Sequence, residues 1–146
     1  MLGKYYSNKN FSGDPALTRG DGPIEFDWDV NEIEGISADN VSVRWEGMLY
    51  VLADATYTLH VASTDQFTLY FDGEQVLDTD IAEFVVDLTA DSYHTIQLDY
   101  VEETAEANVA LQWKQGDGDF ETIPAENLWN QLPDMIGNTQ YGIILS

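Results

Sequence analysis

The hydrophobic and polar residues of this chain alternate over short runs with the two-residue period of β-strands. In the stretch FTLYF, residues 67–71, every second side chain is a large apolar one, which is the pattern of a strand with one buried face. Asp72-Gly73 follows directly and supplies the positive-φ pair that a two-residue hairpin turn needs. The chain then returns through residues 75–77, so the pattern predicts a β-hairpin over residues 67–77.

Strand-like runs recur along the rest of the chain, while helical periodicity is nearly absent. The further runs are residues 41–49, 57–63, 83–88, 94–100, 108–114 and 120–123. About eight or nine short strands at this spacing indicate an all-β fold, either an antiparallel β-sandwich or a jelly-roll-like barrel. The apolar phase of the strands predicts a core made of Trp45, Leu59, Leu69, Phe71, Ile96, Leu98, Leu111 and Trp113.

Two segments do not show this alternation. Residues 13–36 are rich in Gly, Pro and Asp, which predicts a long ordered loop. Residues 130–146 contain one apolar run, YGIIL, which is either a last edge strand or the start of a linker. We therefore expect one β-sandwich domain over residues 1–129, followed by a C-terminal strand or linker over residues 130–146.

The charge is the unusual feature of the composition. Five Lys and Arg residues face 27 Asp and Glu residues, a formal net charge of −22. Nucleic acids and anionic membranes bind to basic patches, so this surface argues against both as partners. No run approaches the ~20 apolar residues of a membrane helix, and no insertion into a membrane is expected. Cysteine is absent, which excludes disulfides and thiolate metal sites.

The usual catalytic patterns are missing, and we expect the chain not to be an enzyme. It has no Cys nucleophile, no G-x-S-x-G elbow and only two histidines, His60 and His94. Neighbouring carboxylates such as Asp27 and Asp29 are common in a chain with 27 acids, so they do not indicate a glycosidase. The tripeptide RGD at residues 19–21 is read by integrins, but a three-letter motif is weak support.

A calcium-binding loop of the EF-hand type has oxygen ligands at fixed positions. Asp27, Asp29 and Asn31 match its first three ligand positions. Glu32 then stands where the loop needs Gly, and Ala38 stands where it needs Glu. The EF-hand reading is therefore excluded.

One acid, Asp65, lies in the short turn between the run 57–63 and the hairpin. Loops at the end of a sheet often carry function. Asp65 is either a turn residue, whose side chain bonds to nearby backbone amides, or part of a ligand site. Sequence pattern alone leaves both readings open.

The order of several segments resembles a known family. In chain order they are GKYYSNKNFSGDPALTR, IEFDW, ADNVSVRWEGML, ATYTLHVASTDQFTLYFDGEQVLD, YHTIQLDYVE, NVALQW and IPAENLW. Together these segments resemble the fourteen-kilodalton N-terminal domain of anthrax protective antigen, the PA-fourteen family, over roughly residues 2–129. The resemblance implies a β-sandwich or barrel-like jelly roll that occurs as a module in bacterial toxins, glycoside hydrolases, adhesins and flocculins.

The resemblance also implies a ligand site. In lectin members, two adjacent Asp residues after the matching strand hold a Ca²⁺ ion that coordinates sugar hydroxyls. The second Asp matches Asp65, but the first is Thr64 here and the following Gly is Gln66. In the second ligand loop, Asn108 could supply an oxygen and Glu106 could replace the lost charge. The implied ligand-binding set is Thr64, Asp65, Gln66 and Asn108, and the implied metal ligands are Asp65, Glu106 and Asn108, with Ca²⁺ as cofactor at a weakened or altered site.

The function implied by the resemblance is non-catalytic carbohydrate binding, as part of a larger secreted or cell-surface protein such as an adhesin or a polysaccharide-recognising protein. Tyr70, Trp28 or Trp129 could stack on sugar rings, and neutral glycans suit the acidic surface better than anionic ones. The alternative is a structural or protein-interaction spacer without a sugar site. The first ten residues have no apolar signal-peptide core, so the extracellular or cell-surface location is inferred from the resemblance alone.

The net charge of −22 predicts that salt stabilises the fold. Self-repulsion is strongest where screening is weak, and the Debye length falls from about 30 Å at 0.01 M salt to about 3 Å at 1 M. Sodium or magnesium chloride should therefore raise the melting temperature, measured by differential scanning calorimetry. A melting temperature that stays constant across this range would contradict the expectation.

Overall fold

The computed structural model of the chain describes residues 1–28, 40–102 and 107–130, which form two antiparallel β-sheets around one core. The predicted all-β sandwich is therefore confirmed. A short 3₁₀ helix, η1 (Ala125–Asn127), precedes the last strand. The strands in chain order are β1 (Leu2–Tyr6), β2 (Leu17–Gly20), β3 (Glu25–Trp28), β4 (Ser42–Val51), β5 (Ala55–Ala62), β6 (Gln66–Phe71), β7 (Glu74–Asp78), β8 (Glu83–Leu88), β9 (Ser92–Val101), β10 (Ala107–Gln115), β11 (Glu121–Thr122) and β12 (Leu128–Trp129).

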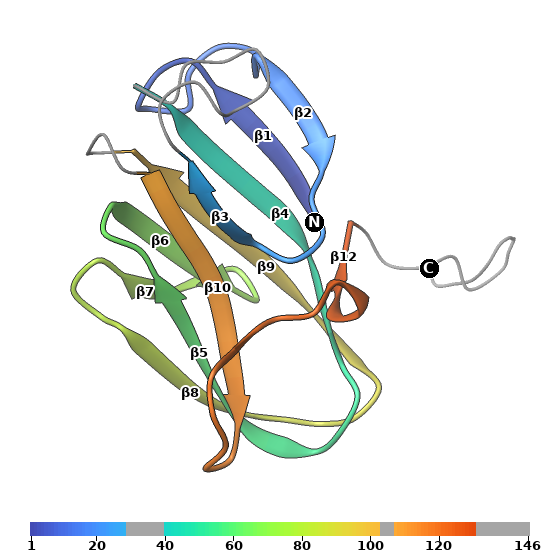
Figure 1. The fold of residues 1–146 in the computed structure, drawn as a ribbon. Helices are drawn as coiled ribbons and strands as arrows, with labels where there is room; N and C mark the ends of the chain where they lie inside the picture. Colours follow the sequence, from blue (N-terminus) through green and yellow to red (C-terminus); the bar gives the residue numbers. More distant parts are fainter. Residues whose placement is uncertain (29–39, 103–106, 131–146) are drawn as a thin grey trace, which may run out of the picture.

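The two sheets differ in size. The larger has seven strands in the order β2-β1-β4-β9-β6-β7, with β12 also paired to β4. The smaller has five, in the order β11-β10-β5-β8, with β3 also paired to β10. In Figure 1 the smaller sheet, with β10 in orange, lies in front of the larger one. Within the described residues, no helix has the length and apolar character needed to cross a membrane.

The predicted hairpin is confirmed as β6 and β7, joined at Asp72-Gly73. Both turn residues have positive φ angles, 51° for Asp72 and 85° for Gly73. This is the backbone conformation that lets a two-residue turn follow the twist of its strands.

The predicted core is also confirmed, because each of the eight residues chosen from the alternation is at most 5% exposed. Trp45, near the middle of β4, is fully buried and packs against aromatic rings from several strands. The Phe26 ring from β3 stacks on it at a centroid distance of 5.9 Å. The rings of Tyr5 and Tyr100 each lie 6.2 Å from Trp45. This cluster joins β1, β4 and β9 of the larger sheet to β3 of the smaller one.

The prediction of a long loop over residues 13–36 is wrong for the described part of that segment, which contains β2 and β3. β2 pairs with β1, and β3 pairs with β10. Each of these strands has only four residues, too few to show a two-residue period against a background of Gly, Pro and Asp. Main-chain pairing with neighbours distant in sequence overrides the local composition.

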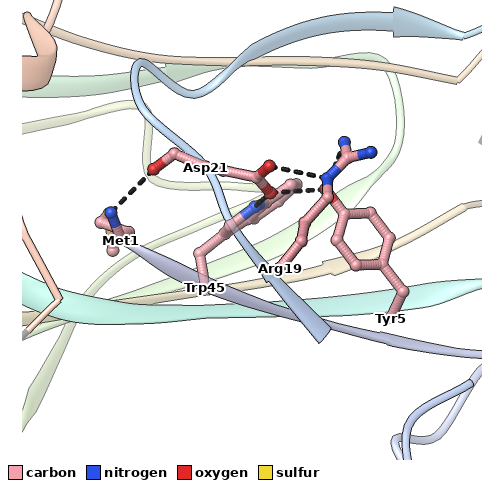
Figure 2. A network of polar contacts seen from close by, with 5 residues as sticks. All are labelled: Met1, Tyr5, Arg19, Asp21 and Trp45. Carbon is pink, nitrogen blue, oxygen red and sulfur yellow. Dashed lines mark hydrogen bonds and ion pairs between the residues drawn. The ribbon is translucent and has the colours of Figure 1, made fainter. Parts of the chain in front are cut away.

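A buried carboxylate, Asp21, fastens β1, β2 and β4 to one another (Figure 2). Its Oδ2 accepts hydrogen bonds from the Tyr5 hydroxyl at 2.6 Å and from Trp45 Nε1 at 2.8 Å. Its Oδ1 accepts one from Arg19 Nε at 2.7 Å, which pairs the charge. The Met1 amino group donates to the Asp21 carbonyl at 2.7 Å.

In this network, Arg19 and Asp21 of the RGD tripeptide have a structural role that involves no receptor. Arg19 and Asp21 bond to each other, and Asp21 is only 8% exposed. Gly3 faces the same carboxylate, and a Cβ placed there would lie 2.6 Å from Asp21 Oδ2. The glycine therefore leaves room for the hydrogen bonds between Asp21 and its partners.

Truncation of the core should be costly. Leu98 is fully buried in β9, so Leu98→Ala should lower the free energy of unfolding by about 2–5 kcal/mol through lost apolar contact and a residual cavity. Urea denaturation monitored by tryptophan fluorescence measures the change. The matched control is Val85→Ala, at a β8 side chain that is 62% exposed, where the cost should stay below about 0.5 kcal/mol. Equal effects of the two substitutions would contradict the assigned strand phase.

Candidate functional site

In the turn between β5 and β6, the side chain of Asp65 points inward and the side chains of its two neighbours point outward. Asp65 is 2% exposed, whereas Thr64 and Gln66 are exposed. Asp65 takes the same inward phase as Phe67, which is buried at the start of β6. The alternation of the strand therefore extends one step into the turn and places a carboxylate at the edge of the core.

The Asp65 carboxylate is held by groups from both sheets. Its Oδ2 accepts a hydrogen bond from the Tyr100 hydroxyl on β9 at 2.6 Å. The same atom accepts the Asn108 N–H on β10 at 3.4 Å, a longer contact. Within the turn, Asp65 N–H donates to Ser63 Oγ at 3.0 Å. Burial, and then the bond to Asp65 and its charge, raise the pKa of Tyr100 above its ordinary value.

Thr64 and Asn108 bond to each other in two places. Thr64 N–H donates to Asn108 Oδ1 at 3.2 Å, and Asn108 Nδ2 donates to Thr64 Oγ1 at 3.2 Å. Ser63 Oγ also donates to the Asn108 carbonyl at 2.6 Å. The structure thus brings together Thr64, Asp65 and Asn108, three residues of the ligand-binding set that the family resemblance implies. Glu106 lies outside the described residues.

The described oxygen ligands do not fit a calcium ion. Ca²⁺ takes six to eight oxygens, with several carboxylates where affinity is high. The turn offers one described carboxylate, Asp65, and it already accepts the Tyr100 hydroxyl. The side-chain oxygens of Asn108 and Thr64 accept hydrogen bonds from each other's residue. Within the described parts of the chain, no three His, Cys, Asp or Glu side chains are grouped as metal ligands.

Gln66, directly after the turn, lines a pocket of about 580 Å³ on the outer face of the larger sheet. Gln66 and Tyr70 reach this face because they alternate along β6 with buried residues. The floor comes from β6 and β9, and one wall comes from the loop after β1. The lining side chains that offer rings or hydrogen bonds include Phe11, Gln66, Tyr70, Asp78, Asp80 and Asp99.

Phe11 is an aromatic residue of the pocket that sequence reasoning missed. Its φ is +56°, in the left-handed region that bulky residues avoid, at a cost of roughly 1–3 kcal/mol. The surroundings hold it there. Its N–H donates to Ser42 Oγ at 3.2 Å, and the Arg44 guanidinium lies 4.6 Å from its ring centroid. The available signal was one large apolar residue inside the polar loop SNKNFSG.

Two histidines and three aromatic residues remain among the candidates from the sequence. His94 Nδ1 lies 2.8 Å from Asp72 Oδ2 in the hairpin, and His60 Nδ1 lies 2.9 Å from the Ala82 carbonyl oxygen. Tyr70 lines the pocket. Trp129 is 36% exposed, at the opposite end of the face. The side chain of Trp28 lies outside the described part of the structure.

The Tyr100–Asp65 bond predicts sensitivity to alkali. A phenol whose folded-state pKa is raised stabilises the fold fully below pH ~10, and this stability is lost as pH rises toward the folded pKa. The loss is at most about 1.4 kcal/mol per pH unit for one tyrosine. Urea unfolding at pH 8 and pH 11 should therefore show a smaller alkaline loss in Tyr100→Phe than in the wild type. Part of the loss should persist, because burial and Asp21 raise the pKa of Tyr5 in the same direction. Identical losses in the two proteins would contradict the role of Tyr100.

The chain matches a family model described as the PA14 domain over residues 1–127. The anti-sigma-I factor RsgI3 of Acetivibrio thermocellus is 30% identical over 137 residues, which cover 88% of this chain and 21% of that protein. This chain thus spans about a fifth of that relative's length.

Two solved structures show the same architecture. An anti-sigma factor domain-containing protein from Clostridium clariflavum superposes with a TM-score of 0.79 at 27% identity, over 94% of this chain and 49% of that one. A PA14 sugar-binding domain from an RTX adhesin has a TM-score of 0.67 at 15% identity, over 88% of this chain and 97% of that one. With the family match covering residues 1–127, the chain belongs to the PA14 domain family, which is the PA-fourteen family that its sequence resembles.

Proposed function

We propose that this domain is a non-catalytic carbohydrate-binding module that recognises uncharged glycans at the pocket beside the β5–β6 turn. The observation that carries the proposal is the 580 Å³ pocket itself, which combines two aromatic rings with several carboxylates and amides. Aromatic faces can pack on the apolar faces of sugar rings. Carboxylates and amides can pair with sugar hydroxyls, and a few convergent polar groups on an apolar surface are typical of ligand sites.

The carboxylates of the pocket support binding rather than catalysis. Both oxygens of Asp99 accept from Arg44, at 2.8 and 3.0 Å. Asp78 Oδ1 accepts the N–H groups of Asp80 and Ile81, at 2.9 and 3.0 Å. These side chains are fixed as acceptors by the fold, and a neutral ligand avoids repulsion from them.

Recognition at this pocket is, in our proposal, independent of calcium. The Asp65 carboxylate is committed to Tyr100, and Asn108 is committed to Thr64. A metal bound here would share these oxygens with their present hydrogen-bond donors and would gain only one described carboxylate from the turn. Binding of Ca²⁺ at this turn should therefore be no tighter than about millimolar, the loose end of oxygen-ligand sites.

The names of the relatives support a place in a larger protein. The RTX adhesin domain is described as sugar-binding, and the proteins of Acetivibrio thermocellus and Clostridium clariflavum are described as anti-sigma factors. We propose that this module recognises a polysaccharide outside the cell, as one domain of a cell-surface or secreted protein. In a regulatory protein, such a module would couple the presence of the polysaccharide to the remaining domains.

A second candidate is a structural or protein-interaction spacer. The burial of Asp65 favours it, because a carboxylate that bonds to Tyr100 and Asn108 can join the turn to both sheets without a ligand. A spacer function does not account for the strained backbone of Phe11 or for the pocket that Phe11 lines. We therefore rank it below glycan binding.

A glycan array of neutral and acidic polysaccharides, read with calcium and again with EDTA, tests the proposal. We expect at least one neutral glycan to bind equally in both conditions. Phe11→Gly should weaken that binding tenfold or more, and the backbone should keep its conformation, because glycine adopts the positive φ of this position freely. Val85→Ala on the opposite sheet is the control.

Three outcomes would count against the proposal. Failure of every glycan to bind would favour the spacer. Binding abolished by EDTA would overturn independence from calcium, as would micromolar Ca²⁺ affinity in calorimetry that is lost in Asp65→Ala. Unchanged binding in Phe11→Gly would place the site elsewhere.

A further inference from the structure

We propose that the outer face of the larger sheet binds the interior of an extended, uncharged polysaccharide chain, which lies along β9 and crosses two adjoining pockets. This inference rests on the proposed carbohydrate-binding function and specifies its ligand as several consecutive sugar units rather than one terminal sugar. It adds a second pocket and an aromatic cluster to the site beside the turn.

The two pockets meet at Tyr70. The first is the 580 Å³ pocket beside Gln66, and the second has a volume of about 380 Å³. Tyr70 lines both, and the second also includes Glu46, Thr95 and Gln97. Tyr70 is paired in register with Gln97, which is paired in turn with Glu46. The depression therefore runs across β6, β9 and β4 without leaving the face.

Strand β9 gives the order of the contacts. Alternate residues of a strand share one face, so Asp99, Gln97, Thr95 and Tyr93 follow one another on this side of β9. Asp99 lines the first pocket, and Gln97 and Thr95 line the second. Asp99 lies six residue steps beyond Tyr93, a length of roughly 20 Å at 3.3 Å per residue. A single sugar ring would fill only part of this length.

An aromatic cluster lies at the far end of the same face. Tyr93 packs against Tyr50 on β4 with ring centroids 4.8 Å apart, and against Trp129 on β12 at 6.0 Å. These residues have the outward phase of their strands, since their neighbours Leu49 and Leu128 are buried. Trp129 is 36% exposed, which is unusual for a ring this large. The face thus offers aromatic surface at both ends, Phe11 and Tyr70 at one and this cluster at the other.

The polar side chains of the face are held in place before a ligand arrives. Arg44 donates to both oxygens of Asp99, and its guanidinium carbon lies 4.6 Å from the centroid of the Phe11 ring. Gln97 Nε2 donates to Asp99 Oδ1 at 3.1 Å. Preorganised side chains lose little conformational freedom on binding, which favours affinity.

Charge decides between the occupants of such a face. Asp78 and Asp80 bring negative charge to the first pocket, and Glu46 brings it to the second. The chain carries a net charge of −22, so a polyanion or a second copy of this chain would be repelled. An uncharged polymer rich in hydroxyl groups meets no such barrier and can pair with the carboxylate and amide groups along β9.

Calorimetry with neutral oligosaccharides of increasing length tests the inference. The probes are cello-, xylo- and manno-oligosaccharides of two to eight units, together with fragments of any neutral polysaccharide that binds on the array. We expect the affinity to rise at least tenfold with length, until the ligand spans both pockets. Tyr70→Ala should weaken binding of every length, since it lies at the junction. Gln97→Ala and Trp129→Ala should weaken the longest ligands at least fivefold and leave the shortest unchanged.

The controls separate this inference from the proposed function. Val85→Ala on the opposite sheet should change nothing, and melting temperatures should show that each variant is folded. Thr95→Ala replaces Gln97→Ala if the latter unfolds, because Thr95 is an exposed residue of the second pocket. Binding that is independent of length, or unaffected by substitutions in the second pocket, would overturn the inference while leaving glycan binding in place. Absence of binding to any glycan, of any length, would overturn both.

Discussion

The hydrogen bond between the Tyr100 hydroxyl and the Asp65 carboxylate is the constraint on which the candidate site depends. Tyr100 belongs to the larger sheet, Asp65 to the turn that joins the two sheets, and Asn108, which also contacts Asp65, to the smaller sheet. A carboxylate buried to 2% exposure must be hydrogen-bonded, because leaving it unpaired would cost several kcal/mol. The turn can therefore adopt few other shapes, and Thr64 and Gln66 are directed outward as a consequence.

A second buried carboxylate, Asp21, is also hydrogen-bonded, and it lies beside Trp45. Asp21 accepts the Tyr5 hydroxyl at 2.6 Å, the same distance as in the Tyr100–Asp65 pair. Both tyrosine rings lie 6.2 Å from the ring of Trp45. The chain has only five Lys and Arg residues for 27 acids, so cations are too scarce to pair with most carboxylates. In both places a phenol donates to the buried acid, and Arg19 adds a cation at one of them.

The parts of this structure that were predictable from sequence are those set by strand alternation. The pleat has a fixed period of two, so the hairpin of β6 and β7 and the buried phase at Leu69 and Leu98 follow from local pattern. β2 and β3 were missed, because four residues carry little periodicity and their pairing depends on distant partners. Phe11 was missed because a positive φ at a bulky residue is imposed by its surroundings, chiefly Ser42 and Arg44.

The candidate site was predictable only as a meeting of two loops. Sequence reasoning left Asp65 as either a turn residue or a ligand, and in the structure its carboxylate accepts hydrogen bonds from Tyr100 and Asn108, both far along the chain. With threonine rather than an acid at position 64, the Asn108 amide can bond to both the main chain and the hydroxyl of Thr64. A carboxylate at position 64 could accept the same Asn108 N–H, but it would place a second negative charge beside Asp65.

Direct hydrogen bonds therefore join the β5–β6 turn to β10. Gln66, the first outward residue after this turn, is then fixed at the rim of the pocket with Tyr70 four residues further along the same strand. The hydrogen bonds of the turn thus set where β6 begins and which of its residues face the pocket.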